Sequence, residues 1–225
     1  MRILAIDTSA GTSVALVDEA GRILGEFDSA DIMRHAETIG HGIQQVLDSA
    51  RLKPENVDAV AVGRGPAPFT GLRVGLAAAL MFGVGRGVPV YGVVSHDAIA
   101  LAELQGPLDA AAGAPVATNA GENQNLLVLT DARRKEVYWS LYRRASQGGQ
   151  PERIAGPGVQ TLAALQTDLA DQRFSYVEAT APCRAADLAR VLLAQLAAGS
   201  ASEDVTALYL RAPDAVPAKP KQVSS

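Results

Sequence analysis

The sequence contains a single cysteine, Cys183, among its 225 residues. One thiol cannot form an internal disulfide, so we expect a reducing compartment and a cytoplasmic location. Long apolar runs are lacking too. The run at residues 76–84 is broken by Gly83 and falls well short of the roughly 20 residues that a membrane span requires. We therefore expect no association with a membrane.

An excess of positive charge is also missing, because 20 Lys and Arg residues face 24 Asp and Glu residues, for a formal net charge of -4. Binding to a phosphate backbone depends on clustered Lys and Arg side chains. The composition therefore disfavours a stand-alone nucleic-acid binder. With 48% hydrophobic and 20% charged residues, the chain has the composition of a globular protein that meets any nucleic acid locally or through a partner.

Apolar stretches separated by turn-forming residues predict a mixed α/β chain. Apolar residues at three- and four-residue spacing predict a helix from Ile32 to Ala50, with Asp31 as its N-cap and Pro54 as its stop. Thr161 is expected to cap a helix over residues 161–169. The other expected elements are strands at residues 3–6, 13–17, 23–27, 59–62, 88–94, 126–130, 137–142 and 176–177, and helices at about 72–85, 97–104 and 184–198.

A segment rich in Gly, Pro, Ala and Asn at residues 105–125 is the best candidate for a linker. The expected units are a first lobe at 1–104, a smaller second lobe at 126–212 and a disordered Pro/Lys-rich tail at 213–225. Each lobe opens with an apolar strand that ends in an aspartate, Asp7 or Asp131, before a turn and a returning strand. We interpret this similarity as a duplication, which predicts two related lobes.

Glycines after the strand expected at residues 59–62 indicate a possible phosphate site. Gly63 and Gly65 allow a tight turn, and the N–H groups at the start of the next helix favour an anion. The loop matches neither the P-loop nor the dinucleotide-binding pattern. The same glycines would equally serve close packing, so both interpretations stay open.

Asp7 and Thr8 would suit the mouth of a nucleotide cleft, and Asp131 holds the corresponding place in the second lobe. The alternative is that each aspartate accepts hydrogen bonds from its own turn. The candidate nucleotide-binding set is Asp7, Thr8, Gly63, Gly65 and Asp131.

The histidines and the cysteine do not form a recognisable catalytic or metal site. His35 and His41 lie six residues apart, on different faces of one helix, so they cannot share a metal ion. His96 lies between Ser95 and Asp97, which we interpret as a helix start rather than a fragment of a catalytic triad. The cysteine lacks a partner pattern and is expected to be a passive thiol. We expect no catalytic residue and no metal.

Small residues recur at every fourth position in the second long helix, as Gly71, Gly75, Ala79 and Gly83. Such a row lets another backbone approach closely, from the same chain or from a partner, and the residues favour neither choice. Residues 133–135 form a basic turn, Arg-Arg-Lys, and most turns of this kind are solvated loops.

Three separated motifs resemble the TsaB (YeaZ) family. They are the opening at residues 1–16, the loop at 63–75 and the stretch at 131–139, and the late segment 209–211 also fits. The resemblance implies an actin-like, Hsp70-like ATPase fold with two ribonuclease-H-like lobes. It also implies a non-catalytic subunit of the machinery for the tRNA N6-threonylcarbamoyladenosine (t6A37) modification, which binds and supports the transferase TsaD.

The resemblance further implies partners and an interface. Family members pair through their first two long helices, with TsaD or as a homodimer when alone, and the ATPase TsaE joins the assembly. Contact with tRNA is implied only through the complex, and no cofactor is implied beyond weak nucleotide binding. The implied interface residues are Ile32, His35, Ala36, Ile39, Ile43, Gly71, Leu72, Gly75, Leu76, Ala79 and Phe82.

Two departures from the family pattern argue against phosphate binding. Ala67 and Pro68 stand where the family has Gly-Ser, which removes a flexible position, a hydroxyl and a backbone N–H. Residues 178–181 lack the glycines expected near a nucleotide. Both departures favour a structural subunit over the alternative, an actin-like-fold nucleotide-dependent enzyme such as a small-molecule kinase or ATPase.

Overall fold

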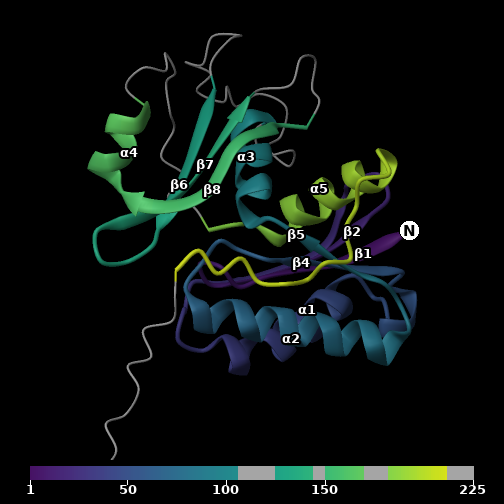
Figure 1. Cartoon of the computed structure of the whole chain (residues 1–225). Coiled ribbons are helices and arrows are strands. Elements are labelled where there is room, and N and C mark those ends of the chain that lie inside the picture. The colour runs from purple at the N-terminus through teal and green to yellow at the C-terminus, as the bar shows by residue number, and fades with distance from the viewer. Residues whose placement is uncertain (106–124, 144–149, 170–181, 212–225) are drawn as a thin grey trace, which may run out of the picture.

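The computed structural model describes residues 1–105, 125–143, 150–169 and 182–211. These residues form two sheets with helices packed around the first (Figure 1). Most of the expected linker and the whole expected tail lie outside the described residues, as does the strand expected at 176–177. None of the described helices is long and apolar enough to cross a membrane.

The first sheet has five strands in the order β3-β2-β1-β4-β5. Strand β1 pairs antiparallel with β2 and parallel with β4, so it lies at the centre of the sheet. Every strand expected in this part of the chain is confirmed within a few residues. The strands are β1 (Arg2–Asp7), β2 (Thr12–Asp18), β3 (Ile23–Ser29), β4 (Ala59–Gly63) and β5 (Val90–Val93).

Helices cover both faces of this sheet. Helices α1 (His35–Ser49) and α2 (Phe69–Arg86) pack on one face, and α3 (Ser95–Gln105) and α5 (Ala185–Ala197) pack on the other (Figure 1). Alternate residues of β1 serve the two cores, because successive side chains of a strand point to opposite faces. Leu4 lies in the α1–α2 core and Ile3 in the α3–α5 core. Burial on both faces explains the continuous apolar run in β1.

The ends of the long helices differ from expectation. Helix α1 begins at His35, with Arg34 as an N-cap that makes no side-chain capping bond. The expected cap, Asp31, instead accepts a hydrogen bond from the backbone N–H of Met33 (2.9 Å), which closes a turn before the helix. The helix ends at Ser49, before the short 3-10 helix η1 (Pro54–Asn56). Helix α2 begins at Phe69, three residues earlier than expected.

The second sheet is antiparallel, with the order β6-β7-β8. The hairpin of β6 (Leu126–Asp131) and β7 (Glu136–Arg143) confirms expectation. Strand β8 (Glu152–Thr161) was not expected, because Gly and Pro at 156–158 disfavour a strand interior and are tolerated at a sheet edge. Helix α4 (Leu162–Leu169) follows, and the Oγ1 of Thr161 accepts a bond from the N–H of Ala164 (3.3 Å), as expected of its cap.

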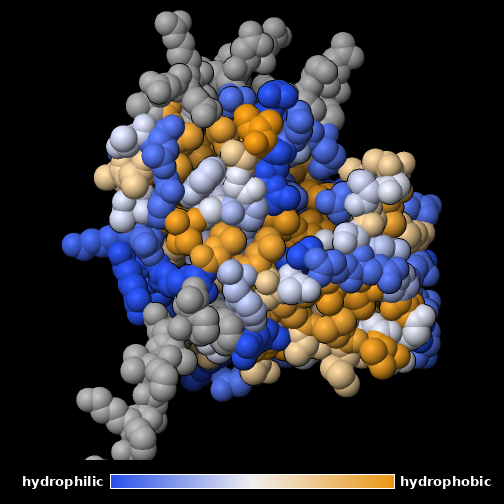
Figure 2. All heavy atoms as spheres, viewed as in Figure 1, coloured by the Kyte–Doolittle hydropathy of each residue, from blue (hydrophilic) through white to orange (hydrophobic). Residues whose placement is uncertain are grey.

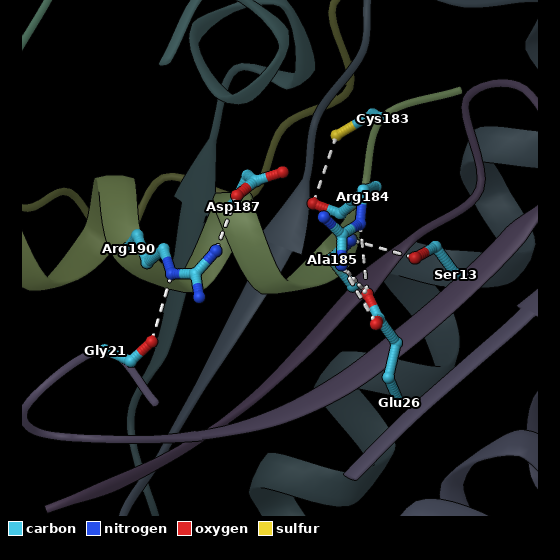
Figure 3. A network of polar contacts seen from close by, with 8 residues as sticks. All are labelled: Ser13, Gly21, Glu26, Cys183, Arg184, Ala185, Asp187 and Arg190. Atoms are coloured by element: carbon cyan, nitrogen blue, oxygen red, sulfur yellow. Dashed lines mark hydrogen bonds and ion pairs between the residues drawn. The ribbon is translucent and has the colours of Figure 1, made fainter. Parts of the chain in front are cut away.

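Helix α5 returns to the first sheet, although the expected second lobe included it. Figure 3 shows its start held by the N–H of Ala185, which donates to Ser13 Oγ (2.8 Å), and by an ion pair between Arg184 and Glu26 (3.0 Å). The segment that follows stays on this lobe, where the N–H of Leu208 donates to the carbonyl of Arg64 (2.9 Å). Helix α5 and the segment around Leu208 therefore pack with the first sheet, whereas Arg211 contacts Ala132 and Glu136 of the second.

Candidate functional site

A cavity of about 910 Å³ lies between the two sheets. The turn after β1, the start of α2, the β6–β7 turn and the last described residues all contribute to its wall. Each contributes a polar group, from Thr8, Thr70, Asp131 and Arg211 respectively. Thr8 and Asp131 are thus the two members of the expected nucleotide-binding set that line the cavity, and the other three members lie behind its wall.

Asp7 is buried at the end of β1, with 1% of its surface exposed. Its Oδ1 accepts hydrogen bonds from the N–H (2.8 Å) and the hydroxyl (2.5 Å) of Ser9, and its Oδ2 accepts one from the hydroxyl of Ser95 (2.6 Å). A Cβ atom at Gly63 would lie 1.9 Å from Oδ2. Both carboxylate oxygens are therefore engaged within the chain, which supports the interpretation that Asp7 stabilises its own turn.

The glycine-rich loop packs against the start of α3. The N–H of Gly65 donates to Ser95 Oγ (3.2 Å), and the N–H of Ser95 donates to the carbonyl of Gly65 (2.9 Å). Gly65 has a φ of 88°, which side-chain-bearing residues rarely adopt. Pro66, Ala67 and Pro68 face the cavity, and the two prolines have no N–H to offer an anion. This geometry supports the close-packing interpretation of the glycines.

Thr8 and Asp131 also make bonds within the chain. The Thr8 hydroxyl donates to the carbonyl of Gly71 (2.9 Å), which joins the β1–β2 turn to α2. Asp131 is exposed, and its Oδ1 accepts a bond from the N–H of Arg133 (2.8 Å), as its turn interpretation expects. Thr8 and Asp131 thus line one cavity, while the hydroxyl of Thr8 bonds to α2 and the carboxylate of Asp131 bonds to its own turn.

His96 connects the start of α3 to the second sheet beside the cavity. Its Nδ1 lies 2.9 Å from Ser140 Oγ of β7, and its Nε2 lies 2.9 Å from Thr130 Oγ1 of β6. Burial, assisted by the charge of Arg153, lowers the pKa of His96 to about 3, so the ring is neutral at physiological pH. Sequence reasoning placed His96 only at a helix start, because nothing local indicates two hydroxyls from a distant hairpin.

The neighbouring Asp97 makes a second connection between α3 and the second sheet. The Tyr142 hydroxyl donates to its Oδ1 (2.7 Å), and Arg153 lies 3.6 Å from the same oxygen. Burial raises the pKa of Asp97, although Arg153 and Tyr142 act in the opposite direction. These contacts hold α3 against β7 and β8 and so fix the wall of the cavity.

The other two histidines, His35 and His41, and the single cysteine, Cys183, make their contacts within the chain. His35 is buried with its Nδ1 2.9 Å from Thr12 Oγ1, whereas exposed His41 packs edge-on against Phe27. Burial raises the pKa of Cys183 well above its usual value, which keeps the thiol protonated and unreactive. Among the described residues, no three His, Cys, Asp or Glu side chains gather as a metal-binding group.

Most of the implied interface residues pack inside the chain. A Cβ atom at Gly75 would lie 2.3 Å from Thr8 Oγ1, and one at Gly83 would lie 2.3 Å from a methyl of Val90. The row of small residues thus faces the sheet, which corrects the interface interpretation of that row. His35, Ile39, Leu72, Gly75, Leu76 and Ala79 are buried, Ile43, Gly71 and Phe82 are half-buried, and Ile32 and Ala36 are exposed.

Exposed apolar side chains lie on the outer side of α2 and in the segment just before α1, and we name them together the α1–α2 surface. Met33, Met81 and Val84 are 84%, 70% and 76% exposed. Ile32 and Leu80 complete it. Figure 2 shows apolar side chains gathered over α2. The three- and four-residue spacing of apolar residues identifies the buried face of a helix. The exposure of Met81 and Val84 becomes evident only once the sheet-facing side of α2 is known.

A solved structure described as YeaZ from Pseudomonas aeruginosa has this fold. It matches with a TM-score of 0.71 over 92% of this chain and 100% of that chain, at 24% sequence identity. The chain shares the fold of that structure, and its mixed α/β sheet with helices on both faces is consistent with the expected actin-like ATPase-type fold.

Sequence relatives identify the family. The profile described as "TsaD: tRNA N6-adenosine threonylcarbamoyltransferase" matches residues 24–216. The chain is 31% identical to the tRNA threonylcarbamoyladenosine biosynthesis protein TsaB of Escherichia coli, over 79% of this chain and 68% of that protein. It is 35% identical to an uncharacterized protein of Mycobacterium tuberculosis, over 96% of this chain and 94% of that one. The chain belongs to the TsaB (YeaZ) group of the TsaD family.

Proposed function

We propose that the chain is a non-catalytic subunit of the t6A37 machinery that binds and supports a TsaD-family transferase. Membership of the TsaB group supports the pathway, since its E. coli member is named for threonylcarbamoyladenosine biosynthesis. The observation that carries the subunit role is the α1–α2 surface. Met81 and Val84 are exposed in the isolated chain, and contiguous exposed apolar residues mark protein interaction sites.

The cavity between the two sheets, which we name the interlobe cavity, supports the non-catalytic part of the proposal. An aspartate at the end of β1 would have to face the cavity to hold a metal-bound nucleotide there. Here the Asp7 oxygens accept three hydrogen bonds from Ser9 and Ser95. Moving the carboxylate into the cavity would leave these donors without their acceptor, which is costly in a buried site.

The proposal includes the remaining partners. The transferase occupies the α1–α2 surface, a second copy of the chain occupies it when the transferase is absent, and the ATPase TsaE joins the assembly. The protein works in the cytoplasm, meets tRNA through the complex and needs no cofactor of its own. The nucleotide-dependent enzyme is the competing function, and titration with Mg-ATP separates the two. Submillimolar affinity that Asp7→Asn abolishes would favour the enzyme.

The direct test replaces two exposed apolar residues of the α1–α2 surface. The double variant M81E/V84E places carboxylates on the patch and is expected to weaken association with a TsaD-family transferase at least about 10-fold, because apolar anchors dominate interfaces. Light scattering of the mixed proteins measures the complex. A matched control, A163E/A164E, adds the same charges to exposed positions of α4 and should leave the complex unchanged.

Reconstitution then connects association to function. Purified transferase, TsaE, the threonylcarbamoyl-AMP synthase, threonine, bicarbonate, ATP and tRNA are combined with each form of the chain, and modified adenosine is measured by mass spectrometry. Modification should require the chain, survive Asp7→Ala at a temperature where that variant is folded, and fall with M81E/V84E. Modification that proceeds equally without the chain would contradict the proposed function.

A further inference from the structure

The turn between β6 and β7 has an unusual backbone. Arg133, Arg134 and Lys135 have φ values of 61°, 54° and 64°, so three successive residues with side chains are left-handed. This conformation is unfavourable for such residues, and at Gly65 and Gly87 the same chain uses glycine for it. Strained backbone of this kind clusters at functional sites. The turn thus has basic residues at positions where glycine would relieve the backbone strain.

Hydrogen bonds hold the turn in this shape. Asp131 Oδ1 accepts from the N–H of Arg133, and the N–H of Ala132 donates to the carbonyl of Glu136 (3.0 Å). The N–H of Glu136 donates in turn to the carbonyl of Arg133 (3.0 Å). Arg211 braces the turn from outside, because its Nη1 donates to the carbonyl of Ala132 (3.1 Å). These hydrogen bonds restrain the backbone from which the three basic side chains project.

The turn is a positive corner on a chain of negative net charge. All three basic residues are exposed, and neither Arg133 nor Lys135 makes an ion pair with another described residue. The carboxylate of Glu136 pairs with Arg211, and the exposed carboxylate of Asp131 accepts a hydrogen bond from the backbone N–H of Arg133. Figure 2 shows hydrophilic side chains gathered at the edge of the molecule where Figure 1 draws the β6–β7 turn.

The corner is separate from the α2 part of the α1–α2 surface, whereas Ile32 and Met33 of that surface line the same cavity as Arg133. It belongs to the second sheet, whereas Met81 and Val84 lie on α2 beneath the first sheet (Figure 1). A transferase docked on the helices therefore does not have to cover the turn. Arg133 also lines the interlobe cavity, together with Asp131 and with Arg211, which is paired with Glu136.

We infer that Arg133, Arg134 and Lys135 bind the phosphate backbone of tRNA when the chain is assembled with the transferase. This inference rests on the proposed function, which supplies tRNA as the polyanion. Clustered, exposed guanidinium and ammonium groups suit phosphates. Tyr138, the nearest aromatic residue of β7, is buried and cannot stack on a base. The contact is therefore independent of base sequence and sensitive to salt.

The test measures binding of a labelled, unmodified tRNA transcript to the assembled complex by fluorescence anisotropy across a salt series. The variant R133N/K135N removes two charges, and asparagine tolerates the left-handed conformation. The matched control R51N/K53N removes two exposed charges elsewhere, and Arg51 is also left-handed, with a φ of 53°. A second variant, R133G/K135G, removes the same charges while relaxing the turn, and serves if the asparagine pair destabilises the chain.

We expect the turn variants to bind tRNA about 3- to 10-fold more weakly and to make the log–log salt slope shallower by about 1 to 2, with the control near the native values. Complex formation, followed by light scattering, should be unchanged. Unchanged tRNA affinity and slope in an intact complex, or an equal loss in the control, would overturn this inference alone. Failure of the native chain to bind the transferase would instead overturn the proposed function, and this inference with it.

Discussion

The hydroxyl of Ser95 lies 2.6 Å from Oδ2 of Asp7, although 88 positions separate the two residues in the chain. This bond joins the end of β1 to the start of α3, and the same hydroxyl accepts a bond from the N–H of Gly65. Ser95 thus links the glycine-rich loop to the buried carboxylate of Asp7. The arrangement gives Asp7 a role in the stability of the fold.

Replacement of Asp7 by alanine is therefore expected to destabilise the fold. The donors from Ser9 and Ser95 would lose their acceptor inside the protein, at a cost of about 2–4 kcal/mol. Urea denaturation measures the change in the free energy of unfolding. Asp28, an exposed aspartate of β3, is the matched control, and its alanine variant should stay within about 0.5 kcal/mol of the native protein. Equal effects at both positions would contradict this account.

Two glycines of α2 should respond in opposite directions to alanine. A Cβ atom at Gly75 would lie 2.3 Å from Thr8 Oγ1, so Gly75→Ala must displace the β1–β2 turn and should cost about 1–3 kcal/mol. Gly85 has no atom within 4 Å of its added Cβ, so Gly85→Ala should stabilise the helix by up to about 1 kcal/mol. Thermal unfolding of the two variants compares them, and a neutral Gly75→Ala would show that α2 does not pack as described.

His96 should make the protein sensitive to acid. Its pKa in the folded state is about 3, below the 6.5 of an unperturbed histidine, so the unfolded state binds more protons between these values. Stability is therefore present above pH 6.5 and is lost as the pH falls toward 3. From pH 7 to 5 this group alone should remove about 2 kcal/mol.

The variant His96→Gln isolates this contribution. Glutamine retains a hydrogen-bonding group for Ser140 or Thr130 but does not titrate. Denaturant unfolding at a series of pH values should show a pH dependence reduced by about 2 kcal/mol between pH 7 and 5. Every other titrating group is common to both proteins and cancels in the difference. Parallel curves for the two proteins would mean that the pKa of His96 is the same in the folded and unfolded states, which would contradict the lowered value.

The buried ion pair of α5 offers a double-variant test. Arg190 and Asp187 are 7% and 4% exposed, and Arg190 Nη1 lies 2.9 Å from Asp187 Oδ1 (Figure 3). Asp187→Ala leaves a buried cation without this partner and should cost about 3 kcal/mol. The double variant D187L/R190M removes both charges and should recover at least about 1 kcal/mol of that loss. A double variant less stable than Asp187→Ala would contradict this assignment.

Local pattern was sufficient for most of the elements. The apolar pattern of β1 and β2, the helical spacing after Ile39 and the hairpin at 126–142 all reflect interactions between residues that are close together in the chain. Residues near element ends were less well predicted. Asp31 closes a turn before α1 instead of capping it, because a short acidic side chain accepts equally well from either backbone segment.

The sequence by itself determined the mixed α/β class and the family, because these follow from period, turn chemistry and ordered motifs. It also singled out candidate residues, of which Thr8 and Asp131 line the interlobe cavity. Only the tertiary structure decided how those residues act. Distant partners such as Ser95 and Ser140 engage Asp7 and His96, the row from Gly71 to Gly83 faces its own sheet, and α5 returns to the first lobe. Each of these outcomes depends on contacts across long stretches of chain, which local pattern does not encode.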